Sequence, residues 1–153
     1  GTIKCGIVDM WLPTIEAIGL STGFLRPSPD TTVTIPATAR KVLSVGAFNQ
    51  DAGSMAPFSG RGYTADGRLV PLIVAYGVDV TAAGYGGGYV RKTGTSFAAP
   101  KISGYAACIM EWGIVRRNDE NMYGEKLIAY MTRYAVGIEG EEMPGIRQGW
   151  GLI

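Results

Sequence analysis

The fold is decided by the stretch Gly94-Thr95-Ser96-Phe97-Ala98-Ala99-Pro100. Apolar residues recur every three or four positions from this stretch onward, which predicts a helix from Thr95 to about Trp112. The helix is apolar on most sides, so we expect it in the interior of an α/β domain. Pro100 falls close enough to the helix start to be tolerated, because the first backbone donors lack intrahelical partners. A serine therefore begins a predicted buried helix.

This placement of Ser96 has a chemical use. Free backbone N–H groups and the positive end of the helix dipole can stabilise a negatively charged oxygen, and Gly94 allows a substrate backbone to come close. For a serine considered alone, a more frequent reason is that Thr95 or Ser96 caps the helix. Both explanations remain open on these residues.

Two continuous apolar runs on the N-terminal side, 42–47 and 72–75, predict strands of a parallel sheet covered on both faces. Between them, 49–68 is rich in glycine and should be mostly loop. Residues 79–91 predict a hairpin with a glycine-rich tip. A phosphate-binding loop is the alternative for that tip, but neither GxxxxGK[ST] nor GxGxxG occurs there. The predicted core comprises Leu43, Val45, Leu72, Ile73, Val74, Ala75, Ala98, Ile102, Ala106 and Ile109.

The two ends of the chain differ in pattern. Residues 124–136 predict an amphipathic surface helix, and 144–151 a turn-rich closing segment. Ile3 to Met10 is β-prone and Thr14 to Ile18 is apolar, so we expect extended chain there, followed by a loop over 21–30. This first part is the least coherent in pattern.

Composition excludes several partners. The 14 Lys and Arg against 13 Asp and Glu give a net charge of +1, which offers no electrostatic basis for binding nucleic acid or an anionic membrane. No apolar run approaches the roughly 20 residues that span a bilayer. Cys5 and Cys108 do not form a metal or redox motif, and we expect both to be reduced and structural.

The chain contains 0 histidines, which removes the imidazole that most often activates a serine and the commonest metal ligand. We expect no metal and no cofactor, since the carboxylates also form no convincing calcium cluster. The chain does not begin with Met and has no signal peptide, which suggests a fragment or a processed chain.

The serine stretch matches the motif Gly-Thr-Ser-x-Ala-x-Pro of the subtilisin-like serine proteases at every specified position. Other segments resemble the family in the same order: 42–48 its "vitVGA" strand, 58–59 its "FSs" turn, 71–78 its "kPdvvAPGv" strand and 150–153 its closing segment. The resemblance covers roughly 31–153. It implies the C-terminal portion of a subtilisin-like three-layer α/β fold, with a mostly parallel sheet and a buried helix carrying the serine.

By this resemblance Ser96 is the catalytic nucleophile, and its own N–H is one oxyanion donor. Thr95 is a second helper there, and Gly94 and Thr93 lie in contact with substrate. The sequence departs from the family at Thr93, where Asn or Ser is usual. Further departures are Tyr76 in place of the proline of Ala-Pro-Gly and Leu72 in place of an acidic residue.

The family's catalytic Asp and His and its oxyanion Asn precede the serine in chain order, and none is present here. The resemblance thus implies that 31–153 is the C-terminal part of the peptidase domain of a longer serine endopeptidase. Without a base, this chain by itself should have little or no peptidase activity. A pseudoprotease or interaction module with the same fold is the alternative. A third hypothesis is that the chain is the whole gene product and a non-enzymatic remnant of the fold. It is disfavoured, because half of the usual sheet would be missing and the edge of the sheet would be exposed.

Residues 1–30 resemble the end of an inserted, β-rich segment. A clostridial branch that includes spore-germination proteases has a jelly-roll insert before the serine, and Trp11-Leu12-Pro13 with 32–36 and 144–150 is similar to its junctions. The resemblance implies a protein or peptide substrate and a bacterial setting, extracellular or spore-associated, although the sequence does not fix a location. An exposed sheet edge would also allow self-association.

Overall fold

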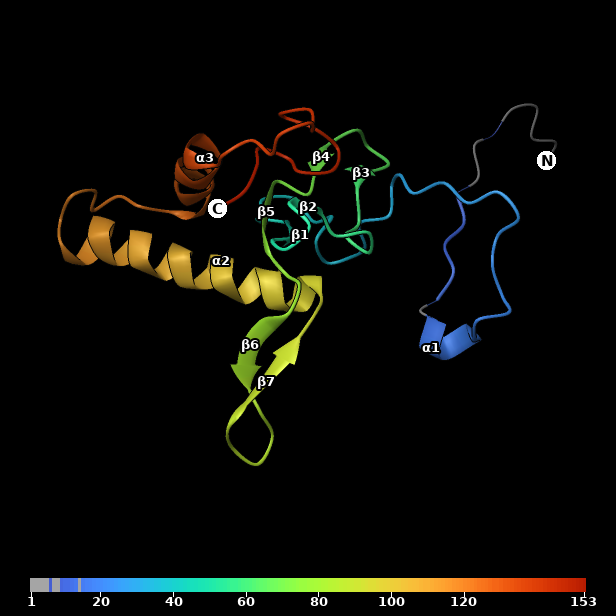
Figure 1. Cartoon of the computed structure of the whole chain (residues 1–153). Helices are drawn as coiled ribbons and strands as arrows, with labels where there is room; N and C mark the ends of the chain where they lie inside the picture. Colours follow the sequence, from blue (N-terminus) through green and yellow to red (C-terminus); the bar gives the residue numbers. More distant parts are fainter. Residues whose placement is uncertain (1–5, 7–8, 14) are drawn as a thin grey trace.

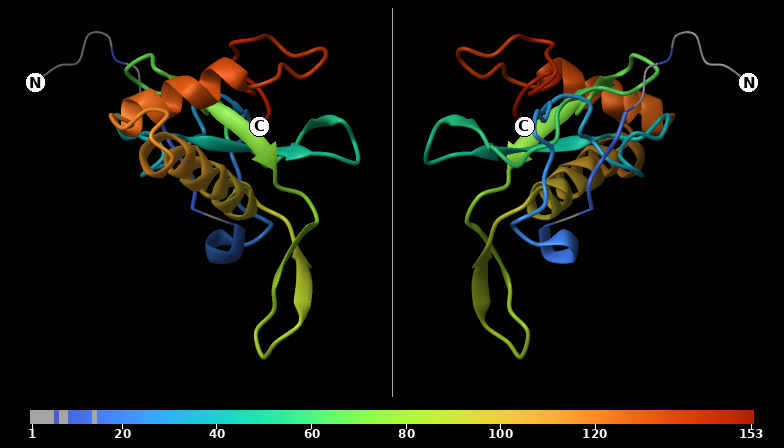
Figure 2. Two further views of the ribbon diagram at one scale, coloured as in Figure 1. Left: turned by 90° about the vertical axis from the view of Figure 1, so that its left-hand side faces the viewer. Right: turned by 90° about the vertical axis from the view of Figure 1, so that its right-hand side faces the viewer.

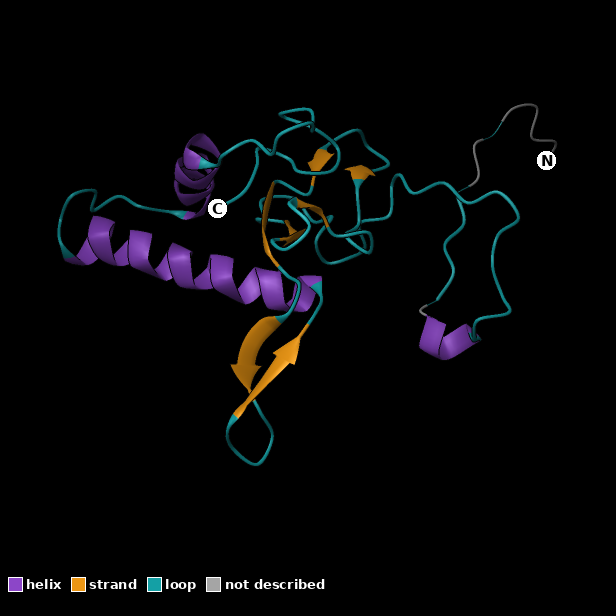
Figure 3. Cartoon of the chain, in the orientation of Figure 1, coloured by secondary structure: helices purple, strands orange, loops and turns teal. Residues whose placement is uncertain are grey.

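The structure is a computed structural model that describes residue 6 and residues 9–13 and 15–153. The prediction for Cys5 lies outside the described residues, as does most of that for Ile3 to Met10. Loops predominate before the first strand (Figure 3). The elements are α1 (Ile15–Ile18), β1 (Val45–Asn49), β2 (Ser54–Met55), β3 (Gly62–Tyr63), β4 (Leu69–Val70), β5 (Ile73–Tyr76), β6 (Val80–Ala83), β7 (Tyr89–Lys92), α2 (Thr95–Met110), a π-helical continuation (Glu111–Val115) and α3 (Gly124–Tyr134).

A three-stranded sheet with the order β2-β1-β5 lies at the centre of the molecule. Strands β1 and β5 pair in parallel, with Val45 opposite Ile73 and Phe48 opposite Tyr76, which confirms the predicted parallel pairing. β2 adds to β1 in antiparallel orientation. Both main strands begin slightly later than the apolar runs. Immediately ahead of the ladder, Leu72 donates its N–H to the carbonyl and side-chain oxygens of Ser44.

Helix α2 lies across this sheet, and α3 packs beside it (Figure 1). The described core cluster joins both strands to both helices, as the sequence predicted for Ile73, Ala75, Ala98 and Ile102. Its buried members are Ala47, Ala56, Ile73, Ala75, Ala98, Ile102, Met131 and Ala135.

The expected burial of α2 is only partly correct. Ala98 and Ile102 are its buried residues, whereas Ala106 and Ile109 are half-buried beside the core, like Leu43 and Val45 in the strand region. Leu72 is also half-buried. The reason is that a helix with apolar residues on most sides needs cover on most sides, and in the described structure only the sheet and α3 provide it.

The uncovered side of α2 forms an apolar groove with α3. Its volume is about 420 Å³, and it is lined by Tyr105, Cys108, Ile109, Trp112, Tyr130, Met131, Tyr134 and Ile153. Cys108 has a free thiol, as the prediction of a reduced cysteine requires, but it is exposed, so the expected structural role was wrong at this position. The surface here is aromatic rather than charged.

The C-terminal elements close the sheet on one side. Met131, on the apolar face of α3, is 1% exposed, which confirms the predicted amphipathic helix. Leu152 then forms isolated bridges to both Val74 and Val136, so the final residues join β5 to the segment after α3. This agrees with the expected turn-rich closing segment.

Strands β6 and β7 form the predicted antiparallel hairpin, with Val80 opposite Lys92 and Ala83 opposite Tyr89. Both views in Figure 2 show it projecting away from the sheet, with its glycine-rich tip farthest out. Tyr85 at the tip and Tyr89 are almost fully exposed. The hairpin joins the end of β5 to the start of α2, so it leads directly into the serine stretch.

The first part of the chain differs from the expectation. Ile15–Ile18 forms one helical turn where extended chain was predicted, and the described residues up to Pro29 include no strand. This segment contacts the remainder through Trp11, whose indole Nε1–H donates to the carbonyl oxygen of Thr31 at 2.9 Å. The loop expected over 21–30 is present.

Candidate active site

Ser96 is the second residue of α2, and it is exposed. Gly94 occupies the N-cap position, and no side chain makes a capping hydrogen bond at this helix end. Capping by Thr95 or Ser96 therefore does not explain why a serine stands here. Ser96 is thus accessible on the first turn of the helix, where a nucleophile would need to be.

The backbone at Gly94 brings the serine to the end of the sheet. Its φ of 153° and ψ of 159° lie in a region that only glycine adopts readily. Its N–H donates to the carbonyl oxygen of Gly77, just after β5, at 2.8 Å. A side chain at Gly77 would not fit, because a Cβ atom there would lie 2.7 Å from the Cβ of Ala47. Two glycines thus allow this close approach.

The first turn of α2 supplies free donors beside Ser96. The N–H of Phe97 is bonded to the carbonyl oxygen of Gly94 at 3.0 Å, but the N–H of Ser96 has no protein acceptor among the described residues. No acidic side chain lies in this turn. The positive end of the helix dipole is therefore uncompensated, and an oxyanion next to Ser96 would be stabilised by both effects.

Thr93 has a structural contact that the sequence did not predict. Its hydroxyl oxygen accepts the N–H of Asp79 at 3.0 Å, and the carboxylate of Asp79 pairs with Arg91. These contacts close the base of the β6–β7 hairpin immediately before Gly94. The Thr93 side chain is exposed, so it lies at the surface next to Ser96 as well.

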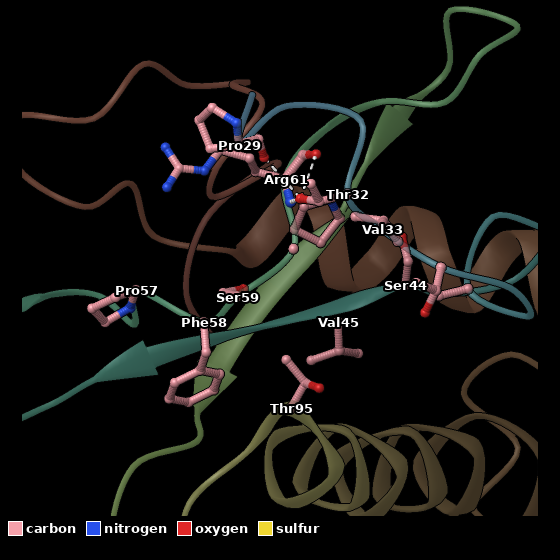
Figure 4. Close-up of a pocket in the computed structure, with 14 residues that line it drawn as sticks. Pro29, Thr32, Val33, Ser44, Val45, Pro57, Phe58, Ser59, Arg61 and Thr95 are labelled. Atoms are coloured by element: carbon pink, nitrogen blue, oxygen red, sulfur yellow. Dashed lines mark hydrogen bonds between the residues drawn. The ribbon is translucent and has the colours of Figure 1, made fainter. Parts of the chain in front are cut away.

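A pocket of about 470 Å³ opens beside the start of α2 (Figure 4). In Figure 4, Thr95 and Val45 face the cavity from one side, and Thr32 and Val33 face it from the other. Its lining is mostly small and uncharged, with Arg61 as the one ionisable side chain; the lining residues are Pro29, Thr32, Val33, Thr34, Ala37, Ser44, Val45, Pro57, Phe58, Ser59, Gly60, Arg61, Pro71 and Thr95.

No sequence pattern predicts this pocket. Its walls come from segments far apart in the chain, and residues such as Thr32 and Ala37 have no motif that distinguishes them from ordinary loop residues. Ser59 could be found, because it belongs to the "FSs" turn. It is buried, and its Oγ accepts the N–H of Ala47 at 3.0 Å, so it holds the turn against β1.

Within residues 6, 9–13 and 15–153, no three His, Cys, Asp or Glu side chains lie close enough together to hold a metal ion. In the same part of the chain, none of the helices has both the length and the apolar character needed to cross a membrane.

The profile of the subtilase family of peptidases matches residues 21–151, which include the serine stretch, both main strands and the closing segment. The chain belongs to the subtilase family. This confirms the resemblance carried by Gly94 to Pro100. The α/β fold is confirmed separately, because solved protease structures superpose on the chain over most of its length.

Among solved structures, the CspB protease of Clostridium perfringens superposes with a TM-score of 0.82 and is 40% identical, and the match covers 86% of this chain and 29% of that protein's chain. C5a peptidase of Streptococcus pyogenes is 33% identical over 99 residues, which is 65% of this chain and 8% of that protein. Serine protease AprX of Bacillus subtilis is 32% identical over 104 residues, 54% of this chain and 24% of AprX. The chain thus spans less than a third of each of these relatives.

Proposed function

We propose that this chain is the nucleophile-bearing part of a serine endopeptidase, and that residues 31–153 form the C-terminal part of its peptidase domain. The observation that carries the proposal is the exposed Ser96 on the first turn of α2, beside a backbone N–H with no protein acceptor. That the relatives named above are proteases supports it. The substrate class is a protein or peptide.

In the proposed reaction, Oγ of Ser96 attacks the carbonyl carbon of the scissile peptide bond. The new O–C bond gives a tetrahedral intermediate whose oxyanion accepts the N–H of Ser96, and Thr95 lies beside it. Collapse breaks the C–N bond, the amine leaves with a proton, and an ester to Ser96 remains. Water then attacks this ester, which releases the acid and restores the hydroxyl group.

The reaction needs a base that removes the proton from Oγ of Ser96. The sequence has 0 histidines, so this chain cannot supply an imidazole. The proposal therefore assigns the base, its aspartate partner and a second oxyanion donor to a longer protein of which this chain is a part. By itself the chain should have little or no peptidase activity, because a serine hydroxyl without a base is a weak nucleophile at neutral pH.

In the longer protein, we propose that residues 1–30 are the end of an inserted segment. We further place the protein in the clostridial branch that includes germination proteases. The similarity to the CspB protease supports this placement. The alternative is a pseudoprotease that binds peptides without cutting them, and it is less well supported because the relatives named above are proteases.

Labelling with a fluorophosphonate probe, which modifies activated serines, tests the proposal. The probe is applied to this chain, to the full-length protein and to the Ser96→Ala variant of the latter. We expect the full-length protein to be labelled at Ser96, and the chain alone and the variant to remain unlabelled. If the folded full-length protein is not labelled, the pseudoprotease is correct. If the chain alone is labelled as fast as the full-length protein, the base lies within residues 1–153.

A further inference from the structure

The segment 30–39, called the strap below, forms one wall of the pocket beside α2. Its first end is fixed to Arg61, the residue before β3, by two hydrogen bonds of Thr32. Thr32 donates its N–H to the carbonyl oxygen of Arg61 at 3.0 Å, and its hydroxyl oxygen accepts the N–H of Arg61 at 3.1 Å. Gly62 permits this approach, since a Cβ atom there would collide with the backbone nitrogen of Thr31.

At the other end, the carbonyl oxygens of the strap are held by one side chain, that of Arg68, next to β4. Its guanidinium donates from Nη2 to the carbonyl oxygen of Thr38 at 2.7 Å and from Nη1 to that of Ala39 at 3.3 Å. Arg40, the residue after the strap, forms a further ion pair with Asp66. The strap therefore has one anchor made by the backbone and hydroxyl group of Thr32, and a second anchor in which the guanidinium of Arg68 binds two carbonyl oxygens.

Asp66 and Thr64 hold the guanidinium in this position. Nε of Arg68 donates to both carboxylate oxygens of Asp66, at 3.1 and 3.0 Å. The hydroxyl of Thr64 donates to Oδ1 of Asp66 at 2.5 Å and accepts the N–H of Arg68 at 2.9 Å. Such a network orients a planar guanidinium more firmly than a single ion pair does.

Between the two anchors, the strap lines the pocket with Val33, Thr34 and Ala37. In the described structure, these residues make no hydrogen bond to another element; the bond from Ala39 N–H to the carbonyl oxygen of Pro36 is local to the strap. The shape of the pocket wall thus depends on where the two ends are held.

We infer that Arg68 is a positioning residue for substrate: by holding the carbonyl groups of Thr38 and Ala39, its guanidinium sets the pocket wall that a peptide contacts beside Ser96. The inference rests on the proposed function for its substrate class. Arg68 touches neither the serine nor the pocket, so it acts on the affinity for peptide and leaves activation of Ser96 unchanged. The lining beside Thr95 is small and uncharged, which suits a neutral side chain of the peptide.

The test uses the full-length protein in the Ser96→Ala background, so that peptide binding is measured without turnover. The variants are Arg68→Met, Arg68→Lys and the matched control Arg40→Met. Arg40 is a suitable control because it pairs with the same Asp66 at 3.1 Å and makes no hydrogen bond with the carbonyl oxygens of Thr38 and Ala39. The probe is a neutral peptide, cut by the active protein or captured from a peptide library, and its Kd is read by fluorescence anisotropy.

We expect Arg68→Met to raise the Kd about tenfold, Arg68→Lys to raise it less, and Arg40→Met to change it by less than about twofold. In the active protein, KM should rise with the Kd while kcat and the rate of probe labelling at Ser96 stay within about twofold.

An unchanged Kd in folded Arg68→Met overturns the inference, as does an equal loss in Arg40→Met. The inference is also overturned if Arg68→Met in the active protein slows probe labelling of Ser96 by the same factor by which it weakens peptide binding. If Arg68→Met does not fold, Arg68→Lys and Thr64→Val provide the same comparison by weakening the anchor without removing it. Failure of the proposed function appears separately, as an unlabelled wild-type protein whose peptide affinity can still be measured.

Discussion

At Gly94 the backbone limits which residue can precede the serine. Its φ of 153° is strained for any side chain, although a Cβ atom would meet nothing closer than Cδ2 of Phe97 at 3.6 Å. We therefore expect Gly94→Ala to lower the free energy of unfolding by about 1 to 3 kcal/mol through the backbone alone. Urea unfolding measures this loss.

Gly104 in the same helix is the matched control. Its φ is ordinary and open space surrounds the position of its Cβ, so Gly104→Ala should be neutral or should stabilise by up to about 1 kcal/mol. Equal effects of the two substitutions would show that helix propensity, and not the conformation of Gly94, governs the response.

The carboxylate of Asp66 should make stability depend on pH. Hydrogen bonds from Arg68, followed by that from Thr64, lower the pKa of Asp66 from 3.8 to about 2. A folded pKa below the unfolded one means that the stabilising contribution is complete above about pH 4 and is lost as the pH falls toward 2. We expect the free energies of unfolding of wild type and Asp66→Asn to converge over this range. A difference that stays constant from pH 5 to pH 2 would contradict the assignment.

Single residues could be predicted from the sequence where they belong to a contiguous motif. Ser96 was predicted on the first turn of a helix and lies there. The role of Gly77 was not predicted, because the contact that requires glycine comes from Ala47, which is distant in the chain. Arg68 was missed for the same reason: an arginine in a loop has no local signal that its partners are carbonyl oxygens of 38 and 39.

Among the elements, α3 depends on one buried side chain. Met131 is 1% exposed, so Met131→Ala should lower the free energy of unfolding by about 2 to 5 kcal/mol through lost burial and a residual cavity. Met110 on α2 is 41% exposed, and Met110→Ala should change stability by less than about 1 kcal/mol. Thermal unfolding of both variants decides this; similar losses would mean that α3 is not anchored through Met131.

The regular elements were predicted well where a period or a glycine cluster marks them. The helices at 95–110 and 124–134 and the hairpin at 80–92 lie close to their predicted positions. The turn at Ile15–Ile18 was missed, because a short apolar run fits a strand or a helix equally well. The short strands β2, β3 and β4 were also missed, since two-residue pairings depend on the partner and not on local pattern.

For the whole molecule, the groove between α2 and α3 should promote self-association of the isolated chain. Its lining is almost entirely apolar, and Trp112 within it is 41% exposed. Sedimentation of wild type and Trp112→Glu measures this, and the variant should shift toward monomer. Trp150→Glu is the control, because Trp150 is 39% exposed and lies outside the groove. If both variants associate like wild type, association occurs elsewhere, as it would through the open sheet edge.

For the molecule as a whole, the sequence does not predict which residues are buried against one another. An apolar helix predicts that something covers it, but not which chain segment does so or where that segment lies. This is why the fold class was predicted correctly while the burial of Ala106, Ile109 and Cys108 was overestimated. The pocket beside Thr95 depends on tertiary packing in the same way.

The exposed thiol of Cys108 lies in the groove between α2 and α3, so its alkylation rate reports how accessible that groove is. A thiol reagent reacts at a rate set by how freely it reaches the sulfur, so alkylation of Cys108 in a Cys5→Ser background acts as a clock for the uncovered side of α2. Fast alkylation in the isolated chain and slow alkylation in the full-length protein would show that the full-length protein covers this side of α2, and the ratio of the two rates would measure how well. The helix that carries Ser96 thus has its own chemical reporter at the opposite end from the serine.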